Sequence, residues 1–118
     1  MNDARNFGEA QNTLTQLAYS AISLNYYNRD PANVDLLAAY RTNYERYALP
    51  PFANDTHPYA SFGHLDGYSA IYYTYQWSQS IALDLFTRFE AEGLRNTDTA
   101  RRYRELVLAP AGRSLPSN

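Results

Sequence analysis

Three tyrosines in the second half of the chain have a spacing that could support acyl-transfer chemistry. Tyr68, Tyr72 and Tyr75 are four and three residues apart, and Gln79 follows four residues later. On a helix with about 100° of rotation per residue, these side chains share one narrow face. Phenol hydroxyls on such a face can donate hydrogen bonds to a carbonyl oxygen as it gains negative charge. The same spacing also fits rings that only pack on neighbouring helices, and both interpretations stay open at this point.

A histidine precedes these tyrosines and is a second candidate for chemistry. His64 follows Gly63 and lies three residues before Gly67. Glycine lets the backbone approach a ligand closely, and an imidazole can hydrogen-bond a substrate carbonyl or titrate near neutrality. An ordinary loop histidine that bonds to backbone is the alternative. The other histidine, His57, precedes Pro58 in a stretch without helical period, so the two cannot form a zinc pair on one helix.

The residue types also limit what this chain could do alone. It contains no Cys, two His residues and no H-E-x-x-H motif. Because a closed zinc site is tetrahedral, we expect that the side chains of this chain alone bind no metal. The candidate chemistry is therefore hydrogen bonding and proton transfer by phenols and an imidazole, without a nucleophile of their own.

The elements that must position these residues are predicted to be helices. No useful stretch alternates with period two, so the expected fold class is all-α. Apolar residues near the N-terminus, beginning at Phe7, recur at steps of three and four, which predicts a helix over residues 3–28. Asp30 as N-cap and Pro31 in the first turn predict a second helix over residues 31–47.

The second half of the chain is expected to hold a long loop and two more helices. Residues 48–66 contain three of the six prolines and no period, which is typical of a functional loop. No glycine or proline interrupts the stretch that follows, which predicts one long helix over residues 67–92, ended by Gly93. Asn96 supplies a cap for a fourth helix over about residues 98–109.

The predicted third helix also carries an apolar stripe that we expect to pack inward. The stripe is separate from the phenol face and contains Ala70, Tyr73, Trp77, Ile81, Leu85 and Phe89. A four-helix piece with this many aromatic residues leaves an apolar face open, which is typical of a protein that has a partner, an oligomer or a missing part of its domain.

Length, charge and composition narrow the class further. The chain has 118 residues and is 45% hydrophobic and 19% charged, which fits one globular domain or a piece of one. Its net charge is −2 and its arginines are spread along the sequence, so we expect no nucleic-acid partner. No apolar run approaches about 18 residues, so no membrane span is expected. The polar start lacks a signal peptide, which favours a cytoplasmic location for this chain.

One stretch resembles a known family. The run from Phe62 to Ser78, FGHLDGYSAIYYTYQWS, is similar to the signature F-[SG]-H…G-Y-x-A-x-Y-Y-x-Y-x-W-[AS] of the thimet oligopeptidase, oligopeptidase A and peptidyl-dipeptidase family of zinc metallopeptidases. Similarity continues into residues 82–108, and residues 4–30 resemble the preceding helix of the family. The resemblance implies that residues 1–118 are one C-terminal fragment of a larger, mostly helical catalytic domain. In that family an upstream H-E-x-x-H helix holds the zinc.

The resemblance also implies roles for individual residues. His64 would hydrogen-bond the bound peptide, and Tyr68 and Tyr75 would bind and polarise the scissile carbonyl. Tyr72 would contact the substrate, as would the backbone at Gly63 and Gly67.

At the level of function, the resemblance implies the substrate-binding part of a zinc-dependent oligopeptidase that cleaves short peptides. Zinc would be the cofactor of the full-length enzyme, and this chain alone would be inactive. Its partners would be a short peptide, the missing zinc-bearing part of the domain and, for the fragment, a second copy of itself. The alternative is a stand-alone helical module that binds peptides or proteins without catalysis.

Overall fold

Residues 7–113 are the part of the chain that the computed structural model describes, and they fall into two compact units that divide after Ser78. Every regular element among these residues is helical, which confirms the predicted all-α class. In chain order the elements are α2 (Glu9–Tyr27), η1 (Pro31–Asn33), α3 (Leu36–Tyr47), η2 (Pro58–Ser61), α4 (Leu65–Tyr68), α5 (Thr74–Glu92), α6 (Thr97–Tyr103), η3 (Arg104–Leu108) and η4 (Ala111–Arg113). Among the short turns, η3 is π-helical and the others are 3₁₀ turns.

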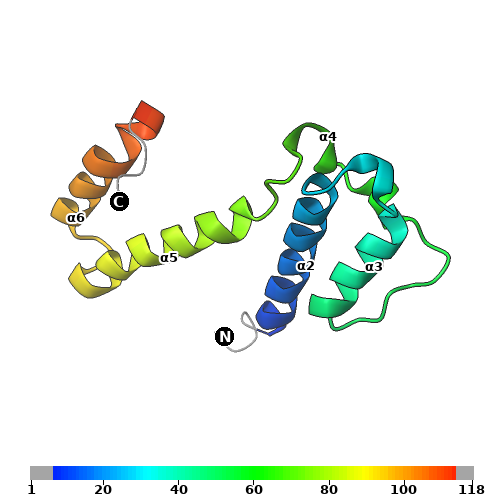
Figure 1. Cartoon of the computed structure of the whole chain (residues 1–118). Helices are drawn as coiled ribbons and strands as arrows, with labels where there is room; N and C mark the ends of the chain where they lie inside the picture. Colours follow the sequence, from blue (N-terminus) through cyan, green and yellow to red (C-terminus); the bar gives the residue numbers. More distant parts are fainter. Residues whose placement is uncertain (1–6, 114–118) are drawn as a thin grey trace. The chain divides into compact units, whose positions relative to one another are not determined.

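The first unit is built on α2 and α3, which lie side by side (Figure 1). Ala18, Ile22 and Tyr40 form its buried apolar core. The Tyr26 hydroxyl donates a 2.7 Å hydrogen bond to the carbonyl oxygen of Leu36, the first residue of α3. This bond joins the last turn of α2 to the start of α3, so the pairing of the two helices is fixed at the end where the chain connects them.

The long loop after α3 is irregular but folds back onto that helix. The ring centre of Phe52 lies 5.9 Å from that of Tyr40 and 6.1 Å from that of Tyr44. The guanidinium of Arg41 lies 5.0 Å from the centre of the Phe52 ring, within the range of a cation–π contact. The loop expected over residues 48–66 is therefore anchored by packing, and its last two residues enter α4.

The first helix differs from its prediction in the face that it buries. α2 begins after Gly8, whose φ of 78° is left-handed, and the predicted start at residue 3 lies outside the described residues. Phe7, which was expected to begin the buried stripe, is 90% exposed, and Leu24 is exposed as well. The buried face instead carries small residues such as Ala18 and Ser23, because other segments of the unit approach the helix closely on that side.

The second helix begins later than predicted. The Asp30 side chain accepts a hydrogen bond from the backbone N–H of Ala32, but this cap starts only the η1 turn. α3 has a cap of its own, Asp35, which accepts from the backbone N–H of Ala38. The prediction over residues 31–47 missed this second aspartate, which restarts the helix after a short extended link.

The single long helix predicted over residues 67–92 is wrong. α4 is one short turn that contains Gly67 at a φ of 87°, Ser69 follows at a φ of 51°, and α5 begins only at Thr74. The reason is a tertiary contact, because the carbonyl oxygen of Ser69 accepts a 2.6 Å hydrogen bond from the Ser23 hydroxyl of α2. Anchoring to α2 therefore overrides the local helix propensity of this stretch.

The second unit is a short helical hairpin. α5 ends at Glu92 and is followed by Gly93, whose φ of 104° suits a C-terminal glycine, and Asn96 caps the next helix as expected from its residue type. The ring centres of Phe89 and Tyr103 lie 5.7 Å apart in an edge-to-face contact between the two arms. The helix expected over residues 98–109 is found as α6 with its π-helical continuation η3.

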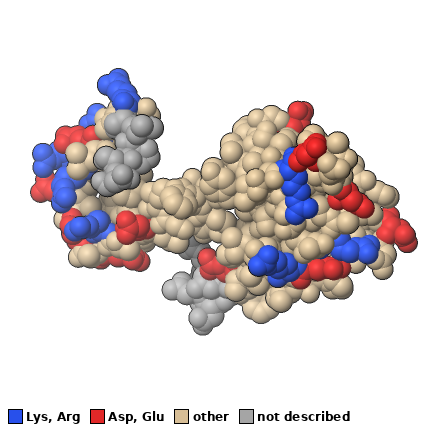
Figure 2. Space-filling model, viewed as in Figure 1, with Lys and Arg blue, Asp and Glu red and all other residues tan. Residues whose placement is uncertain are grey.

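The surface shows charges of both signs. Acidic and basic side chains are interspersed on the face that Figure 2 presents. The net charge of the sequence is −2. Within residues 7–113, no helix combines the length and the apolar character that crossing a membrane would require.

The Asn96 cap gives a first test of the second unit. Its side-chain oxygen accepts from the backbone N–H groups of Asp98 and Thr99 at 2.9 and 3.3 Å. We expect Asn96→Ala to destabilise α6 by about 1 kcal/mol and to speed hydrogen exchange at both amides. Asn96→Asp keeps the acceptor and loses only the hydrogen bond that Nδ2 donates to the carbonyl oxygen of Glu92, so exchange at both amides should stay slow. Unchanged exchange in Asn96→Ala would mean that packing alone holds α6.

Candidate functional site

Aromatic rings gather around His64 in the first unit. The centre of the His64 ring lies 6.0 Å from that of Tyr68, 5.1 Å from that of Tyr72 and 5.7 Å from that of Tyr75. The rings of Tyr72 and Tyr75 meet edge to face at 5.2 Å. We call these four residues the His64 cluster. All four were singled out from the sequence, and the structure brings them together.

One polar contact joins His64 and Tyr75 within the His64 cluster. The Nε2 atom of His64 is 3.0 Å from the hydroxyl oxygen of Tyr75. If Nε2 carries a proton, the imidazole donates to the phenol oxygen and the phenol keeps its own proton for another acceptor. If Nε2 is bare, the phenol donates to the imidazole instead. The pair can therefore present either a phenol donor or an imidazole N–H, depending on the tautomer.

The members of the His64 cluster differ in exposure. Tyr68 is 61% exposed, Tyr75 is 54% exposed, and His64 is exposed as well. Tyr72 is half-buried, and its hydroxyl donates a 2.9 Å hydrogen bond to the side-chain oxygen of Gln16. The hydroxyl of Tyr72 is thus already used within the protein, whereas Tyr68, Tyr75 and His64 are accessible to a ligand.

Burial changes the acidity of the half-buried phenol. Loss of solvent around the ring, and then the neighbouring phenols of Tyr19 and Tyr75, raise the pKa of Tyr72 above its ordinary value of 10.0. Both effects disfavour a phenolate, because the negative charge would lie in a less polar site beside other phenols. Tyr72 therefore remains a neutral hydrogen-bond donor to Gln16 at physiological pH.

The phenols of the His64 cluster meet for a different reason from the predicted one. The phenols do not share one face of a continuous helix, because Tyr68 ends α4, Tyr72 lies in the irregular link and Tyr75 lies in the first turn of α5. The non-helical backbone at Gly67 and Ser69, rather than helical spacing, folds the link back so that His64 reaches Tyr75. Gln79, which the helical spacing had included, belongs to the second unit.

The two glycines beside His64 have different reasons to be glycine. Gly67 has a φ of 87°, in the left-handed region that side-chain-bearing residues rarely adopt. Gly63 has no such need, and a Cβ atom at either position would meet nothing within 4 Å. Open space therefore borders the backbone at both positions, and a contact with substrate there stays a prediction.

Half of the apolar stripe expected to pack inward is open in this chain. Tyr73 and Ile81 are exposed, and Trp77 is 67% exposed, whereas Ala70, Leu85 and Phe89 are half-buried. The interpretation as a core face is therefore wrong for Tyr73, Trp77 and Ile81. These side chains instead form uncovered apolar surface on α5 and the link before it.

Metal ligands do not gather in the described part of the chain. Within residues 7–113, no three His, Asp or Glu side chains lie close enough to hold a metal ion. Zinc would need such a set, so these residues do not fit a zinc site by themselves. What the His64 cluster can do is donate hydrogen bonds and exchange a proton between an imidazole and a phenol.

Sequence reasoning missed the residues of α2 that support the His64 cluster. Gln16, Tyr19, Ser23 and Tyr27 each contact the segment from Phe62 to Tyr72. Their spacing of three, four and four residues places them on one helical face, and this was the signal available in the sequence. The apolar stripe that begins at Phe7 is the more obvious local signal, and it lies on another face of the same helix.

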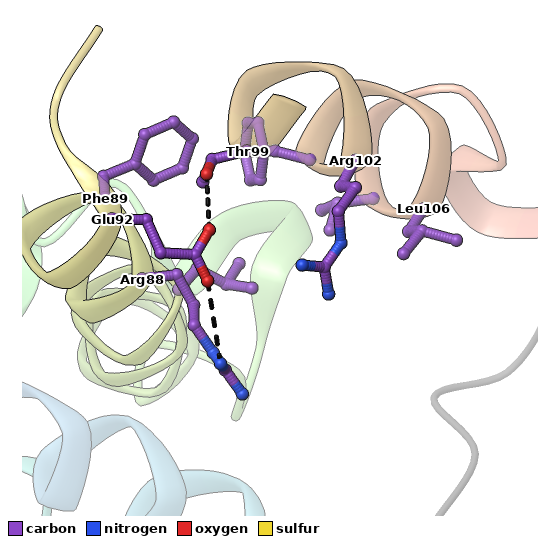
Figure 3. Close-up of a pocket in the computed structure, with 9 residues that line it drawn as sticks. Arg88, Phe89, Glu92, Thr99, Arg102 and Leu106 are labelled. Atoms are coloured by element: carbon purple, nitrogen blue, oxygen red, sulfur yellow. Dashed lines mark hydrogen bonds and ion pairs between the residues drawn. The ribbon is translucent and has the colours of Figure 1, made fainter. Parts of the chain in front are cut away.

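The second unit contains a small hollow between its two arms. It encloses about 120 Å³ and is shown in Figure 3. The carboxylate of Glu92 is engaged there by the Thr99 hydroxyl at 2.5 Å and by Arg88 at 3.9 Å. The other lining residues are largely apolar, namely Leu85, Phe89, Tyr103, Leu106 and Val107, together with Arg102. Since it offers mainly packing surface, the His64 cluster remains the candidate site.

A family model and several known proteins are similar to this chain. The model of peptidase family M3 matches residues 1–118. A thimet-like oligopeptidase from Dictyostelium discoideum is 34% identical over 117 residues, which are 98% of this chain and 17% of the relative. A probable cytosolic oligopeptidase A from Arabidopsis thaliana is 29% identical over 122 residues, which are 96% of this chain and 17% of that relative. Oligopeptidase A from Escherichia coli is 39% identical over 58 residues, 48% of this chain and 8% of the relative.

The chain corresponds to only a part of each of these relatives. The chain spans 17% of the length of the Dictyostelium and Arabidopsis relatives. No solved structure gives a significant match to the chain. The similarity therefore concerns a limited part of each relative, and it does not by itself assign the activity of the whole relative to this chain.

The acidity of the buried phenols gives a second test. Burial is the main cause that raises the pKa of Tyr26 from 10.0 to about 12, and it raises those of Tyr40 and Tyr72 in the same direction. A pKa that is higher in the folded chain stabilises the fold fully below pH 10, and this stabilisation is lost as the pH rises through the folded-state pKa.

We therefore expect three late-ionising tyrosines in an ultraviolet titration, with helix content falling as they ionise. Tyr26→Phe should remove the step near pH 12. If all tyrosines instead ionised together near pH 10 while the helices persisted, the described burial of these phenols would be wrong.

Proposed function

Because the chain belongs to peptidase family M3, we propose that its His64 cluster is part of the substrate-binding side of a metallo-oligopeptidase that cleaves short peptides. The observation that carries the proposal is the 3.0 Å contact between His64 and Tyr75, beside the accessible phenol of Tyr68. These are hydrogen-bonding groups suited to the carbonyl oxygens and N–H groups of an extended peptide. They also coincide with the residues that carry the family resemblance.

The proposed roles follow from the donors that remain free. His64 hydrogen-bonds the bound peptide through its imidazole, and Tyr68 and Tyr75 donate to the scissile carbonyl as it becomes an oxyanion. In the tautomer with a proton on Nε2, His64 donates to Tyr75, which leaves the phenol proton available for the carbonyl. Such a chain of hydrogen bonds also polarises the phenol and makes it a better donor.

The proposal assigns binding and polarisation to this chain, but not the attack on the peptide bond. The described residues supply no metal ligand set. Oxyanion donors without a nucleophile do not hydrolyse a peptide, so we propose that the chain alone is inactive. The zinc of the full-length family enzyme is proposed to be held by a part of the polypeptide other than residues 7–113.

A stand-alone binding module is the second candidate function. The observation that favours it is that the His64 cluster is assembled within the first unit, from residues of this chain alone. A peptide could dock on these exposed rings without any reaction. The two candidates make different predictions about turnover when the chain is joined to a zinc-bearing partner.

The open apolar surface supports a proposed partner. Trp77, Leu83 and Leu94 are large apolar residues with most of their surface exposed. Their burial would contribute roughly 25 cal/mol for each Å² removed from water, so a cover over them is favourable. We propose the zinc-bearing part of the peptidase as that cover, and a second copy of the chain in its absence.

The name of one relative bears on the cellular location. The Arabidopsis relative is named a probable cytosolic oligopeptidase A. From this similarity we propose a cytoplasmic location for this chain.

A chimera tests the proposed catalytic role. Residues 1–118 would replace the matched 117-residue segment of the Dictyostelium thimet-like oligopeptidase, and cleavage of a quenched fluorescent short peptide would be followed. We expect a zinc-dependent peptidase in which Tyr75→Phe or Tyr68→Phe lowers kcat on the order of 10²–10³-fold, the effect of losing one oxyanion donor. The phenol acts mainly in the transition state, so KM should change less than kcat.

Tyr73→Phe is the matched control, since Tyr73 neighbours the cluster in sequence but makes no contact with its rings among the described ring contacts. It should leave kcat unchanged, and residues 1–118 alone with added zinc should not cleave the peptide. Near-normal kcat in Tyr68→Phe and Tyr75→Phe, with a lowered melting temperature, would make these phenols packing residues and refute the proposed role.

The exposed apolar surface can be tested on the chain alone. We expect self-association that increases with concentration, and binding of a hydrophobic dye, because α5 carries exposed Trp77, Ile81 and Leu83. Light scattering and dye fluorescence are the measurements. Trp77→Ser with Leu83→Ser should weaken both signals. A compact monomer at all concentrations, without dye binding, would contradict the proposed cover.

A further inference from the structure

One face of α2 carries a stripe of side chains that hydrogen-bond or pack beyond the helix. Its members, Gln16, Tyr19, Ser23 and Tyr27, are spaced by three, four and four residues. At 3.6 residues per turn this spacing keeps all four on one side of the helix over about three turns. The stripe includes polar groups where a packing helix normally has apolar ones, so each member needs a partner.

All four members find their partners in a single segment. The Tyr27 hydroxyl donates to the carbonyl oxygen of Leu65 at 2.6 Å, and the Ser23 hydroxyl donates to that of Ser69 at 2.6 Å. Figure 1 shows α4 close to one end of α2, in line with these bonds. Ser23 is also almost completely buried, so its bond is shielded from water.

The remaining two members contact side chains rather than backbone. The Tyr72 hydroxyl donates to the side-chain oxygen of Gln16 at 2.9 Å. The ring of Tyr19 lies 5.3 Å from that of Phe62 and 5.7 Å from that of Tyr72. The segment is therefore held near its start, at two carbonyls in its middle and at its last phenol.

The segment needs this support because it cannot organise itself. Gly67 and Ser69 have positive φ values, and the residues from Ser69 to Tyr73 form no regular helix. A non-glycine residue in such a backbone conformation is strained and persists only where surrounding contacts determine it. Those contacts come from α2, which is itself a regular helix of 19 residues.

We infer that this face of α2 is the template that sets the geometry of the His64 cluster, and that Gln16 is the positioning residue for Tyr72. The inference rests on the proposed function of the cluster, since it says what holds the binding groups in place. Gln16 fixes the Tyr72 hydroxyl, and the Tyr72 ring then supports His64 at 5.1 Å and Tyr75 at 5.2 Å. Tyr72 thus contributes its ring to the cluster, while its hydroxyl is hydrogen-bonded to α2.

Gln16→Leu tests the inference in the 118-residue chain by NMR. Leu keeps much of the side-chain volume but cannot accept the phenol hydrogen bond. We expect the nuclear Overhauser contacts between the rings of Tyr72 and His64 to be lost and the His64 ring resonances to shift, because the neighbouring ring moves away. Gln16→Glu retains an acceptor and should restore both signals.

Gln11→Leu is the matched control, because Gln11 is an exposed glutamine on the same helix. It should leave the Tyr72–His64 contacts intact. Tyr72→Phe removes the same hydrogen bond from its other end and keeps the ring, so it replaces Gln16→Leu if that variant fails to fold. Preserved Tyr72–His64 contacts in both Gln16→Leu and Tyr72→Phe would overturn the inference.

The chimera separates this inference from the proposed function. There, Gln16→Leu should lower kcat by up to about 10²-fold with a smaller change in KM, as expected for misplaced catalytic groups, while Gln16→Glu should recover activity. If Gln16→Leu disrupts the NMR contacts but Tyr75→Phe leaves turnover normal, the positioning inference stands and the proposed function fails. If Tyr75→Phe lowers kcat as expected and Gln16→Leu changes neither the Tyr72–His64 contacts nor kcat, the proposed function stands and the inference fails.

Discussion

The capture of two backbone carbonyls by hydroxyls of α2 is the interaction on which the first unit depends. Ser69 lies within the continuous helix predicted over residues 67–92, where its carbonyl oxygen would have bound an N–H group of that helix, and Leu65 lies just before it. Had that helix formed, Tyr68 and Tyr75 would be separated by about 10 Å along its axis, at about 1.5 Å per residue. The side-chain hydroxyls give the carbonyls other partners, and the chain can then fold back and bring His64 to Tyr75.

The fold class and the identity of the clustered residues could be predicted from the sequence, but the way they meet could not. Periodicity and residue type are local signals, and they correctly indicated an all-α chain and singled out His64, Tyr68, Tyr72 and Tyr75. The break after α4 depends on Ser23, a residue 46 positions away from its partner. A serine within a helix carries no sign of such a distant contact, so propensity alone favoured one long helix.

Exposure divides the His64 cluster into parts that face the protein and parts that are free. Tyr72 is tied to α2 by its hydroxyl, and burial raises its pKa, so it behaves as a fixed neutral support. Tyr68 and Tyr75 keep most of their rings accessible beside an exposed imidazole. This division resembles the usual arrangement of binding sites, in which a few free polar groups are oriented by others that are fully engaged. The chain holds such an arrangement although it spans only 17% of the length of two relatives.

The sequence separation of these contacts has a consequence for the order of folding. The bond between Tyr26 and Leu36 closes a loop of 10 residues, whereas the bonds of α2 to Leu65 and Ser69 close loops of 38 and 46 residues. Closing the longer loops costs roughly 1 kcal/mol more in chain entropy, and contacts of this range form late in folding. The α2–α3 pair should therefore assemble first and act as the surface on which the His64 cluster is completed. A chain in which only the α2–α3 pair had assembled would be helical, yet would not have formed the His64 cluster.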